Sequence, residues 1–146
     1  DNDYATIYNI LSGNFYRPIF SKEYGDLYFS IAIGEGKVEI DVDTNTITLS
    51  GDLTGKIMDN EPNFTIRNLD TLEKLNNDFQ KLINKKLDEF IKVLQENKSD
   101  ILFLAESYYQ DKTIKEENFW VNLDIESDVA FYINKKGLIY EVQDEN

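Results

Sequence analysis

Residues 72–94 have the sequence LEKLNNDFQKLINKKLDEFIKVL, and this stretch decides the fold class. Its apolar residues recur at intervals of three and four, which is the period of one face of an α-helix. They are Leu72, Leu75, Phe79, Leu82, Ile83, Leu87, Phe90, Ile91 and Leu94. The stretch predicts one long amphipathic helix. Its opposite face is polar and mixed in sign, with Glu73, Lys74, Asn77, Lys81, Asn84, Lys85, Asp88, Glu89 and Lys92.

Upstream of this helix, apolar residues alternate with polar ones, which is the period of a β-strand with one buried face. The alternation predicts strands at 27–33, 37–42 and 46–50, with Gly34-Glu35-Gly36 as a turn between the first two. They form an antiparallel meander whose wet face carries Glu39, Asp41, Thr46 and Thr48. The polar residues 51–68 are expected to form a mobile connection.

The two ends of the chain add short elements. Residues 4–11 have the spacing of a short helix, and residues 101–105 with Tyr108 and Tyr109 favour a second one, with a buried strand as the alternative. Residues 119–125 and 129–142 favour strands that close in a hairpin at Gly137. The predicted fold is therefore α+β, a single domain over 1–146 in which one mainly antiparallel sheet packs against one long amphipathic helix, with short additional helices.

The composition excludes most enzyme mechanisms. The 146 residues include no cysteine and no histidine, which removes thiolate nucleophiles, most transition-metal ligation and Ser-His-Asp catalysis. No apolar run approaches the roughly 18 residues that span a bilayer. The chain carries 28 acidic and 15 basic residues, a formal net charge of −13 that repels nucleic acid and favours basic proteins as partners. The compartment stays open, with a slight preference for the cytoplasm.

Acidic residues raise two chemical alternatives. Asp41, Asp43, Asn45 and Asp52 have the spacing of oxygen ligands in a calcium loop, but Thr46 stands where that loop needs glycine. A plain hairpin turn is the favoured interpretation. Paired carboxylates, such as those near Asp124, show no cleft that a glycosidase would need. We therefore expect no enzyme activity, no cofactor and no metal.

What remains is a protein that binds another protein. The predicted partner-binding residues combine carboxylates with exposed tyrosines. They are Glu39, Asp41, Asp124, Glu126, Asp128, Tyr108, Tyr109 and Tyr132. The favoured function is an immunity protein that neutralises a basic toxin or nuclease by covering its positive site. The alternatives are a phage-encoded nucleic-acid mimic, similar in role to an anti-CRISPR protein, and an extracytoplasmic structural or calcium-dependent module.

Overall fold

The computed structural model describes residues 2–14, 19–24, 27–58, 69–102, 104 and 118–134, and it confirms the α+β class. The elements are α1 (Asn2–Leu11), β1 (Ile19–Tyr24), β2 (Leu27–Val42), β3 (Thr46–Ile57), α2 (Leu69–Asn97), the 3-10 turn η1 (Phe119–Asn122) and β4 (Asp124–Ile133). The strands form one sheet in the order β1-β2-β3-β4. The first two pairings are antiparallel, whereas β3 and β4 are parallel.

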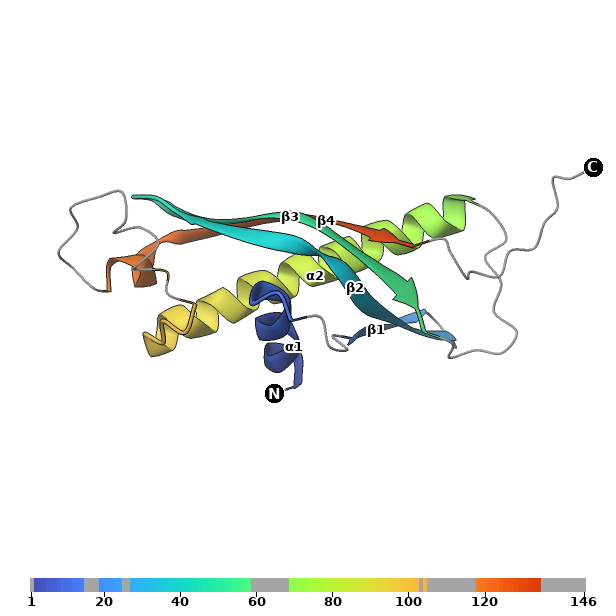
Figure 1. The fold of residues 1–146 in the computed structure, drawn as a ribbon, viewed down its shortest axis with the longest axis horizontal. Coiled ribbons are helices and arrows are strands. Elements are labelled where there is room, and N and C mark those ends of the chain that lie inside the picture. The colour runs from blue at the N-terminus through green and yellow to red at the C-terminus, as the bar shows by residue number, and fades with distance from the viewer. Residues whose placement is uncertain are drawn as a thin grey trace, which may run out of the picture.

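The predicted long helix is α2, which lies along the sheet (Figure 1). Its apolar stripe is buried, and Phe79, Ile83 and Leu87 are completely inaccessible to solvent. The inner side chains of β2, β3 and β4 pack against this stripe, and the buried apolar residues form one cluster. Removal of these two matching apolar faces from water is the main force that holds helix and sheet together.

The predicted helix at 4–11 is α1, which packs beside α2 and β2. Ile7 and Ile10 are buried, and the Tyr4 ring lies 6.0 Å from the Phe90 ring. The helix ends at Leu11, and Gly13, two residues beyond it, has a φ of 79°. Among the described helices, none has the length and the apolar character needed to cross a membrane.

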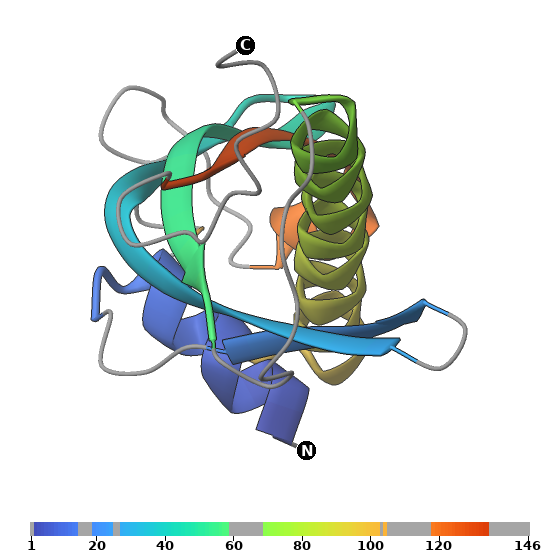
Figure 2. The same ribbon diagram turned by 90° about the vertical axis from the view of Figure 1, so that its right-hand side faces the viewer.

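The sheet curls strongly around α2 (Figure 2). Gly36 of β2 and Gly51 of β3 allow the backbones of these two paired strands to approach each other closely. Both residues have a positive φ, 128° and 140°, that favours glycine. A Cβ atom at Gly51 would lie 2.0 Å from the carbonyl oxygen of Lys37. The pairing register of β2 with β3 also shifts between Ile33 and Glu35, which is a β-bulge. Bulges and glycines increase strand twist and allow a sheet to curve.

Several predicted boundaries are wrong. The segment Gly34-Glu35-Gly36 is not a turn but the middle of β2, so the two expected strands are one. Residues 51–57 continue β3 and are not a loop. Strand β1 was not predicted, and residues 119–122 form a 3-10 turn instead of a strand. Most of the predicted helix at 101–109 and the whole return strand at 138–142 lie outside the described residues.

Candidate interaction surfaces

The outer face of β2, β3 and β4 brings the predicted carboxylates together. The pairing registers align them in two rows across the strands, each with a hydroxyl residue in the centre. These rows are Glu39, Ser50, Asp128 and Asp41, Thr48, Glu126. All four carboxylates are exposed, and about 10 Å separates the β2 members from the β4 members. Asp124 extends the β4 column beside Thr46. We call these five carboxylates the outer acidic face.

The predicted tyrosines have different positions. Tyr132 lies on the outer face of β4 next to Thr54, and 54% of its surface is exposed. Tyr108 and Tyr109 lie outside the described residues. The structure therefore places one predicted aromatic residue near the outer acidic face, and binding by any of these residues stays a prediction.

Of the four residues with calcium-loop spacing, Asp43 and Asn45 lie in the hairpin turn, whereas Asp41 and Asp52 lie on the flanking strands, so the four do not converge. The Asp43 carboxylate accepts hydrogen bonds from the Asn45 and Thr46 amides, both at 2.7 Å. These two bonds lower the pKa of Asp43 below its ordinary value of 3.8. Asp52 pairs with Lys37, four positions along β2 from Asp41, which is about 13 Å. Within the described ranges, no three carboxylates gather to hold a metal ion.

The edge of β4 that faces α2 is closed by side chains of the helix. Amide oxygens of Asn76, Gln80 and Asn84 accept hydrogen bonds from the backbone amides of Ile133, Phe131 and Val129, at 2.8, 2.9 and 2.9 Å. Asn84 also donates to the carbonyl oxygen of Val129. We call this series the amide ladder. It satisfies edge groups that would otherwise be open to pairing with another strand.

The ladder follows from matching helix and strand periods. Four residues of helix rise about 6 Å and two residues of strand about 6.6 Å, so each step of four along α2 meets each step of two along β4. At the next step, the Asp88 carboxylate accepts from the Ser127 hydroxyl at 2.5 Å. Gln95 ends the series as a donor to the carbonyl oxygens of Trp120 and Leu123.

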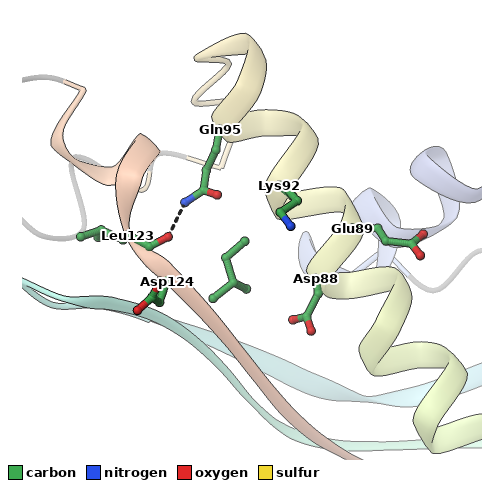
Figure 3. A pocket seen from close by; sticks show the side chains of 7 residues that line it. Asp88, Glu89, Lys92, Gln95, Leu123 and Asp124 are labelled. Carbon is green, nitrogen blue, oxygen red and sulfur yellow. Dashed lines mark hydrogen bonds between the residues drawn. The ribbon is translucent and has the colours of Figure 1, made fainter.

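A cavity of about 290 Å³ lies in the gap between Asp88 and Gln95 (Figure 3). Its lining mixes charged and apolar side chains from the two elements. The lining residues are Asp88, Glu89, Lys92, Gln95, Leu123, Asp124 and Ile125. Neither the cavity nor the amide ladder was predicted.

The interpretation of the polar face of α2 needs correction. Asn84 and Asp88 were grouped with its charged residues, but both are half-buried and bonded to β4. The sequence does contain a signal, because Asn76, Gln80, Asn84 and Asp88 recur at intervals of four and lie beside the apolar stripe. Which strand would meet these residues is not visible in that pattern.

Comparison with known proteins gives two findings. Residues 1–137 match the family model described as spore germination B3/GerAC like, C-terminal. The crystal structure of the GerBC protein has a similar fold, with a TM-score of 0.70 at 18% sequence identity, and the match covers 90% of this chain and 45% of that chain. The chain thus spans less than half the length of that protein. No curated protein matches it.

These findings overturn the functions predicted from charge. The predicted immunity protein that neutralises a basic toxin or nuclease is wrong, and so is the phage-encoded nucleic-acid mimic, because the family match covers nearly the whole chain. The match says nothing about an extracytoplasmic structural or calcium-dependent module, but the four residues with calcium-loop spacing do not converge. The net charge of −13 suits many acidic proteins and identifies none of them. The charge of a protein indicates only which surface charge a partner would have, whereas a family match indicates the biological process in which the family takes part.

Proposed function

The chain belongs to the spore germination B3/GerAC-like, C-terminal family, and on that premise we propose that it is a domain of a germinant-receptor subunit. The family match over residues 1–137 carries this proposal. The match covers 45% of the GerBC protein, so we propose that germinant response belongs to a larger receptor and that this domain is one part of it.

The proposed role is binding and not catalysis. Among the described groups, Asp43 has a perturbed pKa, and its carboxylate is occupied by the hairpin turn. The carboxylates of the outer acidic face are exposed, and Glu39 forms a solvent-exposed ion pair with Lys37 at 3.5 Å. A general acid or base normally needs a positioned partner and a tuned pKa.

The proposed partner is another subunit of the receptor, and the proposed contact surface is the outer acidic face. The inner face of the sheet is occupied by α2, whereas the outer face of β3 and β4 is uncovered by any described element. Its carboxylates are held in register by backbone pairing, so a partner would meet a rigid pattern of charge. Tyr132 adds an exposed ring of the kind that is enriched at interface centres.

The proposed location is a spore membrane, reached through the receptor assembly. This replaces the cytoplasmic location that the sequence slightly favoured.

Spores of the native host test the proposal. One strain lacks the gene, and a second carries the full-length protein with Glu39→Gln, Asp41→Asn, Asp124→Asn, Glu126→Gln and Asp128→Asn. Both are expected to lose most of their germination response to nutrients, measured as the fall in optical density of a spore suspension. Immunoblotting checks that the variant protein accumulates normally.

The control strain carries Glu73→Gln and Glu96→Gln, which neutralise exposed carboxylates on α2. It is expected to germinate like the wild type. Normal germination of the deletion strain would refute the proposed function. Failure of the deletion strain together with normal germination of the five-site variant would refute only the proposed contact surface.

A further inference from the structure

The amide ladder lacks one acceptor, at Lys92. The ladder pairs residues 76, 80, 84 and 88 of α2 with residues 133, 131, 129 and 127 of β4, so the next step sets position 92 against Ile125. A lysine ammonium has three donors and no acceptor. We propose that the cavity at this step binds a carboxylate, which accepts the Ile125 amide hydrogen bond and pairs with the Lys92 ammonium.

The direction of the Ile125 amide follows from strand parity. The amides of Asp124 and Asn134 donate toward the β3 side, to the carbonyl oxygens of Asn45 and Gly55. The amides of Val129 and Phe131 donate toward α2. Ile125 has the same parity as Val129, so its amide faces α2, and no described group accepts from it. A backbone amide next to an ammonium is a favourable environment for an anion.

The carboxylates near the cavity do not take the place of the ligand. Asp88 is bonded to Ser127, and Glu89 lies 3.9 Å from Lys85 and points away from the cavity (Figure 3). Asp124 lines the cavity as well as the outer face of the sheet, so an incoming anion meets the negative charge of three carboxylates beside the one ammonium. In the part of the chain that the structure describes, Lys92 has no ion-pair partner. The one cation in the lining is therefore available to an incoming anion.

The shape of the cavity limits the ligand. A volume of about 290 Å³ accommodates a carboxylate on a short carbon chain, and Leu123 and Ile125 supply apolar contacts for that chain. Two sources have this chemistry, a free short-chain carboxylic acid and a Glu or Asp side chain of a bound polypeptide. The site lies on the seam between α2 and β4, so this inference goes beyond the proposed contact through the outer acidic face.

Nuclear magnetic resonance of the ¹⁵N-labelled chain tests the site, with sodium propionate as the probe and propionamide as the neutral counterpart at constant ionic strength. Propionate is expected to shift the Ile125 amide resonance saturably, with a Kd on the order of millimolar. Propionamide is expected to bind about tenfold more weakly or not at all, because it lacks the charge.

The decisive variant is Lys92→Gln, which offers an acceptor at position 92 and completes the ladder. It is expected to raise the melting temperature and to weaken propionate binding about tenfold or more. Lys81→Gln is the matched control, since it removes an exposed charge of the same helix three turns away and leaves the ion pair of Lys85 with Glu89 in place, and it should bind propionate like the wild type. No saturable shift at Ile125, or an equal shift in Lys92→Gln, would overturn the proposal.

A second titration separates the two sources. The probe is the peptide acetyl-Gly-Glu-Gly-amide, compared with propionate. Binding of the peptide about tenfold tighter would assign the site to a polypeptide side chain, and equal or weaker binding would assign it to a free acid. Binding of neither probe would refute the site, and the germination test of the outer acidic face would be unaffected.

Discussion

The two faces of β2, β3 and β4 consist of alternate residues of the same strands and have opposite chemistry. The inner face is aliphatic and aromatic and is covered by α2, whereas the described part of the outer face carries carboxylates, hydroxyls, exposed lysines and the exposed Tyr132. Side chains of a strand point alternately to the two sides of a sheet, so neighbouring residues can have unrelated roles. The inner face therefore sets stability, whereas the outer face makes no part of the core.

The neighbours Phe131 and Tyr132 give the largest expected contrast. Phe131 is 1% exposed, and its ring lies 6.3 Å from that of Phe79. Phe131→Ala is expected to lower the free energy of unfolding by about 3–5 kcal/mol, because it leaves a cavity in the core. Tyr132→Ala, on the exposed side, is expected to change it by at most about 0.5 kcal/mol. Urea denaturation measures both, and equal losses would refute the division between the faces.

Gly51 tests whether the curl of the sheet depends on backbone shape. Gly51→Ala is expected to cost about 2–3 kcal/mol, since the residue has a φ of 140° and the new methyl group would meet the carbonyl oxygen of Lys37. Gly34→Ala is the control, because the nearest backbone atom to its Cβ, the Thr54 oxygen, is 4.0 Å away. Thermal unfolding should show a large fall in melting temperature for Gly51→Ala and little change for Gly34→Ala.

The amide ladder is polar, yet like the inner face of the sheet it holds α2 against β4, so we expect it to contribute to stability. Asn84→Ala leaves both the amide and the carbonyl group of Val129 without their partner and is expected to cost about 1–3 kcal/mol. Asn77→Ala is the matched control, because Asn77 is exposed on the same helix. Hydrogen exchange should also speed up at Val129 in the first variant. Unchanged exchange there would argue against the ladder.

The smallest expected effect lies at the Asp43 turn, which joins the two long strands at the solvent-exposed end. Its pKa is lowered in the folded state, so its contribution to stability is present above its ordinary value of 3.8 and is lost as the pH falls through the lower folded value. Asp43→Asn keeps an acceptor but loses the charge. Its melting temperature should therefore lie slightly below that of the wild type at pH 7. The difference should close below pH 3.8, and a constant difference would contradict this account.

Alternation and helical periodicity predict elements well where one face is buried along the whole element. That condition holds for α2 and for most of β2 and β3, which is why their apolar residues were found correctly. The condition fails at Gly34-Glu35-Gly36, because a curved strand that contains glycines has the same local composition as a turn. The predicted carboxylates do lie on one surface. Strand alternation places them on the solvent side of the sheet, whichever register pairs the strands.

The sequence by itself determined the α+β class, the long amphipathic helix, the absence of histidine and cysteine chemistry, and the acidic character of the outer face. Each of these depends on residue type or on local periodicity. The tertiary structure alone decided the parallel pairing of β3 with β4, the curl of the sheet around α2, the amide ladder and its gap at Lys92. These features depend on residues far apart in the sequence. The bonds of Asn84 and Asn76 to β4 join residues 45 and 57 positions apart, and no local pattern specifies which strand lies beside which helix.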